Sequence, residues 1–156
     1  MVTRRLFATA ALASTAACAF DKDKTVFRGK TLTGEIFTNE TLKGKAVLIQ
    51  FWATWCGYCR RDQPHVDAVT REYASKGLVV LAVDVEEPRA KVEAYLKTSP
   101  RAPKIVLSSE TNLVELFGAR AFPTYVILNQ EGKAVGAQEG AGGRIGLDDL
   151  LSRVTL

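Results

Sequence analysis

The sequence predicts a single α/β domain in which a central mixed β-sheet is flanked by helices. Two stretches, residues 46–52 and 78–83, are almost continuously apolar, as expected for parallel strands that are covered on both faces. Each is followed by apolar residues at helical spacing, which favours strand–helix–strand units joined by right-handed crossovers. The chain has 156 residues, 47% of them hydrophobic, which is enough for one domain with a sizeable core and short for two.

Turn and cap signals predict the other elements. Residues 25–38 favour a short β-hairpin with Gly34 in its turn, an N-terminal extension of the sheet. Gly77 can end the first helix in a left-handed cap, and Pro88 can begin the second. The later elements are a strand at 105–107, a brief helix capped by Ser109 or Thr111 and ended by Gly118, strands at 124–128 and 134–138 around a turn, and a final helix whose apolar face holds Leu147, Leu150, Leu151 and Val154.

Residues 1–19 have the pattern of an export signal, so we expect the mature domain to be residues 20–156. A basic pair, Arg4 and Arg5, precedes an uncharged, alanine-rich run that is too short for a convincing membrane-spanning helix. The pair followed by two apolar residues resembles a twin-arginine motif, and an ordinary secretory signal remains the alternative. Export would place the protein in the periplasm or another extracytoplasmic compartment, where disulfides persist.

Cys18 lies where such a signal is cleaved. The segment 16–18, Ala-Ala-Cys, resembles the end of a bacterial lipoprotein box, whose cysteine is lipidated and anchors the protein to the membrane. Thr15 departs from the leucine that is usual there. The alternative is cleavage after Ala19, which would discard Cys18. In either case the mature domain keeps one redox-capable pair, Cys56 and Cys59.

The net charge gives little support to nucleic-acid binding. The formal charge is +4, but without residues 1–19 the chain has 19 Lys and Arg against 17 Asp and Glu. No basic cluster interleaved with aromatic residues remains. We therefore expect no nucleic-acid partner.

The chemistry is carried by Cys56-Gly57-Tyr58-Cys59, directly after the first buried strand. Two cysteines three positions apart at the start of a helix lie on one face, close enough to form a disulfide. Unpaired N–H groups and the helix dipole lower the pKa of a thiol at the helix N-terminus. These arguments assign Cys56 as the nucleophile and Cys59, one turn further in, as the resolving thiol.

Residues 51–59, Phe-Trp-Ala-Thr-Trp-Cys-Gly-Tyr-Cys, resemble the active-site strand and turn of the thioredoxin superfamily. Gly44-Lys45 ahead of the strand and the export signal make the chain similar to the TlpA/ResA branch, over about residues 25–155. The resemblance implies a thioredoxin-like fold.

A second matching segment is Ala121-Phe122-Pro123-Thr124. In the family this proline is cis and faces the cysteines, and the residue before it offers its backbone to a substrate strand. The resemblance therefore assigns Phe122 and Pro123 to substrate binding, and it places Trp55 and Tyr58 at the rim of that surface.

The group that handles the proton of Cys59 is less directly indicated. Many thioredoxins carry a buried Asp at the position of Gln50, which cannot titrate. Asp62, three residues after Cys59, lies on the same helical face and matches an acidic position of ResA-like proteins. We assign Asp62 as the proton acceptor, with a surface aspartate between charged neighbours as the alternative.

The sequence gives less support to other roles for the cysteine pair. A structural disulfide across so tight a loop would contribute little stability, and one Cys-x-x-Cys supplies only two metal ligands, so we expect no metal. A copper-handling thiol chaperone usually needs a third ligand, and His65, the sole histidine, points away from the cysteine face. Disulfide isomerases of the Dsb type share the Cys-Gly-Tyr-Cys sequence but carry a separate dimerisation domain.

The sequence therefore predicts an extracytoplasmic thiol–disulfide oxidoreductase, acting as a protein disulfide reductase by family resemblance. A Dsb-type isomerase or oxidase is the alternative. We expect protein thiols and disulfides as substrates, a membrane-bound redox partner, a monomer, and no cofactor beyond the Cys56–Cys59 pair.

Overall fold

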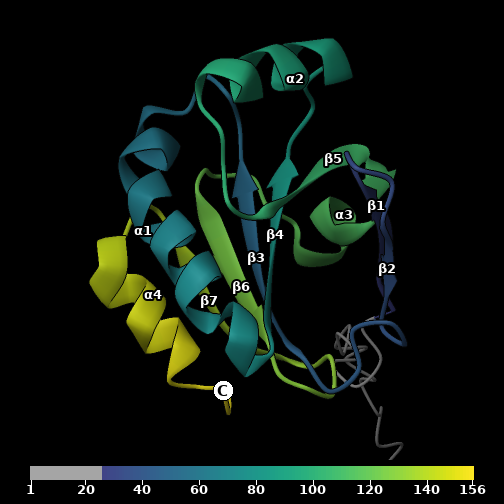
Figure 1. Ribbon diagram of the computed structural model, residues 1–156, viewed down its shortest axis with the longest axis vertical. Helices are drawn as coiled ribbons and strands as arrows, with labels where there is room; N and C mark the ends of the chain where they lie inside the picture. Colours follow the sequence, from purple (N-terminus) through teal and green to yellow (C-terminus); the bar gives the residue numbers. More distant parts are fainter. Residues whose placement is uncertain (1–25) are drawn as a thin grey trace, which may run out of the picture.

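The computed structural model describes residues 26–156, so the predicted export signal and Cys18 lie outside the described residues. One central sheet carries helices on both faces (Figure 1). In chain order the elements are β1 (Arg28–Thr31), β2 (Ile36–Thr38), β3 (Ala46–Trp52), α1 (Gly57–Tyr73), a 3₁₀ turn (Ala74–Lys76), β4 (Leu78–Asp84), α2 (Arg89–Thr98), β5 (Lys104–Thr111), α3 (Leu113–Phe117), β6 (Thr124–Leu128), β7 (Ala134–Glu139) and α4 (Gly143–Leu151).

The strands form a seven-stranded sheet in the order β2-β1-β5-β4-β3-β6-β7. The central strands β3, β4 and β5 are parallel, and β6 and β7 add antiparallel pairs on one side. On the other side, β1 pairs antiparallel with both β5 and β2. The predicted mixed sheet with flanking helices is confirmed, and its active-site strand β3 lies between β4 and β6.

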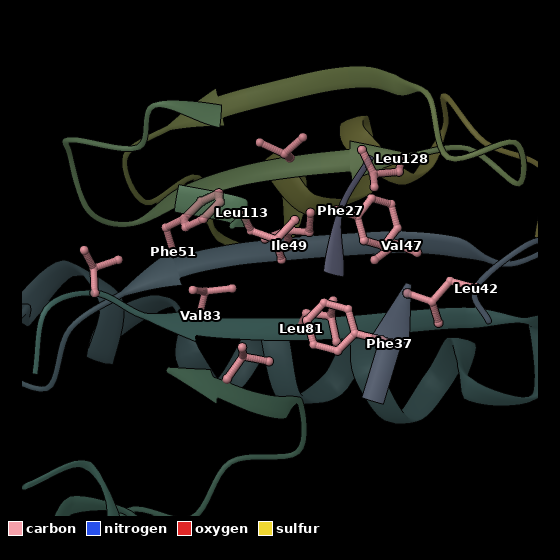
Figure 2. Close-up of a cluster of buried hydrophobic side chains, with 13 residues drawn as sticks. Phe27, Phe37, Leu42, Val47, Ile49, Phe51, Leu81, Val83, Leu113 and Leu128 are labelled. Atoms are coloured by element: carbon pink, nitrogen blue, oxygen red, sulfur yellow. The ribbon is translucent and has the colours of Figure 1, made fainter. Parts of the chain in front are cut away.

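The two faces of the sheet explain why β3 is apolar throughout. Its odd-numbered residues contribute to a core beneath α3 and the β1–β2 hairpin, and its even-numbered residues face α1 and α4. Figure 2 shows the first of these cores, in which Phe27 and Phe37 lie over Val47 and Leu81. A third cluster joins both cysteines to Trp52 and Ala82 and to Val92 of α2. The disulfide therefore lies on the α1 face, at the carboxyl end of β3.

Two local signals behave as the sequence indicates. Gly77 follows the 3₁₀ turn with φ 87°, a conformation that glycine adopts without a steric penalty. Residues 28–38 form the hairpin of β1 and β2, with Gly34 in the left-handed region at φ 91°.

The region around β5 differs from the prediction. The strand runs over Lys104–Thr111 instead of residues 105–107, because its polar second half pairs with β1. Ser109 and Thr111 therefore belong to the strand, and Asn112 is the N-cap residue of α3. The Thr111 hydroxyl still accepts a hydrogen bond from the N–H of Leu113, at 3.3 Å.

In the part of the chain that the structure describes, no helix has both the length and the apolar character needed to span a membrane.

Candidate active site

Cys56 and Cys59 form a disulfide at the start of α1, with their Cα atoms 5.2 Å apart. Cys56 is the N-cap residue, in an extended conformation, and its Sγ accepts a hydrogen bond from the N–H of Cys59 at 3.1 Å. A sulfur in this position faces the unpaired N–H groups and the positive end of the helix dipole. The arrangement therefore favours the thiolate of Cys56 when the pair is reduced.

The two sulfurs differ in access. Cys59 is completely buried, whereas Cys56 keeps 4% of its surface exposed. The neighbouring Trp55 and Tyr58 are each 61% exposed, and they border the pair along the sequence. A large incoming partner therefore meets Cys56 first, between two accessible aromatic side chains.

The second predicted segment lies beside the disulfide. The peptide bond between Phe122 and Pro123 is cis, and Pro123 is buried at the beginning of β6. The Phe122 ring contacts the Trp55 ring edge-to-face, with centroids 6.0 Å apart, and it also packs against the cluster that contains both cysteines. The antiparallel pairing of β6 with β3 brings this loop, more than 60 residues away in sequence, to the cysteine turn.

A shallow cavity of about 380 Å³ opens next to this aromatic pair. Its walls are mainly apolar, with one acidic and one basic residue at the edge. The lining residues are Trp55, Val85, Glu86, Val114, Ala119, Arg120 and Phe122. The guanidinium of Arg61 lies over the Tyr58 ring, 4.8 Å from its centroid.

Asp62 is 2% exposed, so the interpretation of this residue as a surface aspartate is wrong. Its Oδ2 accepts a hydrogen bond from the Tyr125 hydroxyl at 2.8 Å, and its Oδ1 accepts one from the N–H of Gly143 at 2.9 Å. Gln50 in turn donates to the Tyr125 oxygen at 3.3 Å. Burial and the neighbouring Asp62 raise the pKa of Tyr125 well above its usual value, so this phenol stays a donor.

The carboxylate of Asp62 therefore connects α1 to β6 and to the first residue of α4. Gln50 cannot titrate, but its amide completes the hydrogen-bond network of Tyr125 and Asp62, which explains a polar residue in the buried strand β3. His65 is exposed on α1, as the helical spacing indicates.

A second acidic group near the cysteines was not predicted. The Glu87 carboxylate accepts hydrogen bonds from the N–H of Thr54 at 2.6 Å and from its hydroxyl at 2.7 Å, and its Oε1 pairs with Lys91 at 2.5 Å. Asp84, the last residue of β4, is fully buried nearby. The signal was available in the sequence: acidic residues directly follow a buried parallel strand, and the carboxyl ends of such strands collect functional groups.

Residues 26–156 contain no group of three or more His, Cys, Asp or Glu side chains arranged to hold a metal ion.

Comparison with known proteins agrees with this geometry. The chain matches the Redoxin family over residues 15–150. It is 31% identical over 109 residues to the thiol-disulfide oxidoreductase ResA of Halalkalibacterium halodurans, a match that covers 70% of this chain and 62% of the relative. This match thus spans less than two thirds of the relative's own length.

Solved structures show the same fold. The exposed lipoprotein thioredoxin of Streptococcus pneumoniae superposes with a TM-score of 0.71 at 26% identity, covering 81% of this chain and 98% of that one. StoA of Bacillus subtilis superposes with a TM-score of 0.69 at 25% identity, covering 81% and 96%. With a cysteine pair at the helix N-terminus and a mixed sheet of this order, the chain belongs to the redoxin family, as a TlpA/ResA-like member of the thioredoxin superfamily.

Proposed function

We propose that the protein is an extracytoplasmic thiol–disulfide oxidoreductase that reduces disulfides in protein substrates. The observation that carries the proposal is the position of the pair: Cys56 lies at the N-terminus of α1 beside the cis-proline loop, and Cys59 is buried beneath it. The names of the relatives support the same chemistry.

The exchange begins with the reduced pair. The Cys56 thiolate attacks one sulfur of the substrate disulfide, and a new S–S bond joins Cys56 to the substrate while the second substrate sulfur leaves as a thiolate and takes up a proton. Cys59 then loses its proton and attacks the sulfur of Cys56. The substrate leaves as a dithiol, two electrons have passed to it, and the protein is left with the Cys56–Cys59 disulfide.

The proposed proton acceptor for Cys59 is Asp62. A carboxylate has about four lone-pair directions, so the bonds from Tyr125 and Gly143 orient the group and leave it able to accept another proton. These two donors belong to different elements, β6 and α4, and together they fix the carboxylate of Asp62 on α1, the helix that begins at the cysteine pair.

Substrate binding is proposed for the surface around Cys56. The backbone of Phe122, before Pro123, is the edge to which an extended substrate segment adds as a strand. The exposed rings of Trp55 and Tyr58 then cover the apolar side chains of that segment. The disulfide pair itself is the only redox group in this proposal, and a membrane-bound partner reduces it again after each cycle.

The proposed location rests on the sequence of residues 1–19 and on relatives such as the exposed lipoprotein thioredoxin. Lipidation of Cys18 stays a prediction, and so does a monomeric state. The reductive direction is supported by the resemblance to ResA alone.

The first experiment is the reduction potential of the Cys56–Cys59 pair, measured by equilibration of the purified protein with glutathione or dithiothreitol buffers. A value near that of thioredoxin, about −270 mV, supports the reductase, and one near that of DsbA, about −120 mV, would instead indicate an oxidase or isomerase.

The roles of the two cysteines are tested with a protein disulfide such as insulin. C59S is expected to accumulate the mixed disulfide through Cys56, and C56S to form none. The W55A variant is expected to slow exchange with insulin about tenfold, by loss of an aromatic contact, while its reaction with dithiothreitol stays unchanged.

A further inference from the structure

The segment that leads into Cys56 is held by a carboxylate that follows the neighbouring strand β4, at the same end of the sheet. Thr54 lies two residues before Cys56, and both its N–H and its hydroxyl donate to Glu87. The Glu87 side chain is only 5% exposed and is further paired with Lys91 of α2. The conformation of the turn before the nucleophile thus depends on the position of Glu87.

Asp84 lies three residues before Glu87 and is buried, and the electrostatics of the two groups couple them through a hydrogen bond between their side chains. Asp84 pairs in register with Trp52 across β4 and β3, so both side chains leave the same face of the sheet, the face that carries the disulfide. Asp84 is completely buried, and neither of its carboxylate oxygens meets a hydrogen-bond donor among the described residues. An ionised carboxylate in that position would be both desolvated and unpaired.

Two adjacent carboxylates can bond to one another only through a proton. Ionised Asp and Glu side chains are acceptors alone, whereas a protonated carboxyl group is also a donor. The bonds that Glu87 accepts from Thr54 and Lys91 require it to be the ionised member. The proton therefore belongs on Asp84, where it supplies the missing donor.

We propose that Asp84 and Glu87 share one proton and that Asp84 is a positioning residue for Cys56: its protonated carboxyl donates to Glu87, which holds the Thr54 segment. The link to catalysis rests on the proposed function, whereas the shared proton and the position of Thr54 do not.

The charged surroundings support this assignment. Burial, followed by the bond to Glu87 and its charge, raises the pKa of Asp84 to about 8, although Arg101 and Lys91 act in the opposite direction. Burial alone would raise the pKa of Glu87, but hydrogen bonds from Asp84, Lys91 and Thr54 outweigh it and bring the pKa to about 2. The two groups are thus separated into an acid and a base at neutral pH, as expected for a carboxyl pair.

The remaining groups around the pair are few. Arg101 stacks on Trp52, 3.4 Å from the ring centroid, and its other facing groups are Tyr95, Asp67 and Tyr125. Lys91 approaches from α2. Above pH 8 the pair carries two negative charges, the bond between them is lost, and Glu87 is repelled from its place beside Thr54.

The shared proton is tested by NMR on the oxidised protein, by following the amide proton of Thr54 from pH 5 to 10. The wild type should show one step near pH 8, which D84N removes because an amide donates to Glu87 at every pH. Absence of the step, or its persistence in D84N, would overturn the proposal.

The positioning role is tested on the reduced protein by the rate at which iodoacetamide alkylates Cys56 at pH 7. E87Q, in which one of the two acceptor oxygens is replaced by an amide donor, and D84A, which loses the donor to Glu87, should react about fivefold more slowly, because Cys56 is no longer held at the helix N-terminus. D84N, which keeps a donor, should stay within about twofold of the wild type. Circular dichroism of each variant checks that it is folded.

Equal alkylation rates in all four proteins would show that the pair does not position Cys56. An equal decrease in the alkylation rate of Cys56 in D84N and D84A would show that Asp84 has only a structural role. Neither experiment uses a protein substrate. If both gave the expected results and the protein still failed to reduce insulin, the proposed function would be wrong, whereas the shared proton would remain supported.

Discussion

Two buried carboxyl groups flank the redox centre, and they differ in what surrounds them. Asp62 meets two donors, the Tyr125 hydroxyl and the N–H of Gly143. Asp84 meets another carboxylate, that of Glu87, and no donor among the described residues. Both residues are aspartates of similar burial, but their hydrogen bonding differs. The Asp62 carboxylate accepts hydrogen bonds from two donors, whereas Asp84 must hold a proton in order to donate one to Glu87. The partners, more than the burial, decide the chemistry.

The largest expected effect is on the pH dependence of stability. Because the folded-state pKa of Asp84 is raised from 3.8 to about 8, the folded protein binds a proton that the unfolded chain has lost between these values. The contribution of Asp84 to the free energy of unfolding is full below pH 4 and falls as the pH rises to about 8. Urea denaturation should show the wild type losing several kcal/mol relative to D84N over this range.

If the free energies of unfolding of the wild type and D84N differed by the same amount from pH 4 to 8, Asp84 would not hold the proton that distinguishes it from Asp62. Glu87 gives the opposite sign, since its pKa is lowered from 4.5 to about 2, so its contribution is lost only as the pH falls through that lower range.

The second prediction concerns Asp62. D62A leaves the Tyr125 hydroxyl and the N–H of Gly143 without an acceptor, and both groups are at least partly buried. We expect a loss of about 3 kcal/mol in the free energy of unfolding of the oxidised protein at pH 7, measured in urea. D62N, which keeps one acceptor oxygen, should lose about half as much. If D62A cost less than about 1 kcal/mol, the network would not anchor α4 as described.

The smallest effect is expected at Glu86, between Asp84 and Glu87. Glu86 has φ 61°, a left-handed conformation that is unfavourable for a residue with a Cβ atom. Its N–H is held by the Ser108 hydroxyl at 2.9 Å. E86G should relieve the strain, whereas the greater conformational entropy of glycine in the unfolded chain acts in the opposite direction. We expect a net stabilisation of about 0.5 kcal/mol. Thermal unfolding measures the change, and E86A, which keeps the Cβ atom, should not stabilise. A destabilised E86G would mean that the loop conformation is not strained.

Elements whose signals are local were predictable. The run of apolar residues in β3, the cysteine spacing and Gly77 each act through their nearest neighbours in sequence, and each appears where it was expected. The second half of β5 was not predictable, because it is polar and only the presence of β1 beside it makes residues 108–111 a strand.

The α/β class and the cysteine pair at a helix start follow from the sequence alone, because apolar runs and a Cys-x-x-Cys spacing are local patterns. The assignment of Cys56 as the nucleophile stays a prediction. The surroundings of the acidic residues depend on the tertiary structure. The partners of Asp62 lie 63 and 81 residues further along the chain, and Thr54 and Glu87 are 33 residues apart. The pKa of a carboxyl group depends on such neighbours and on exclusion of water, and no local pattern in the sequence records either.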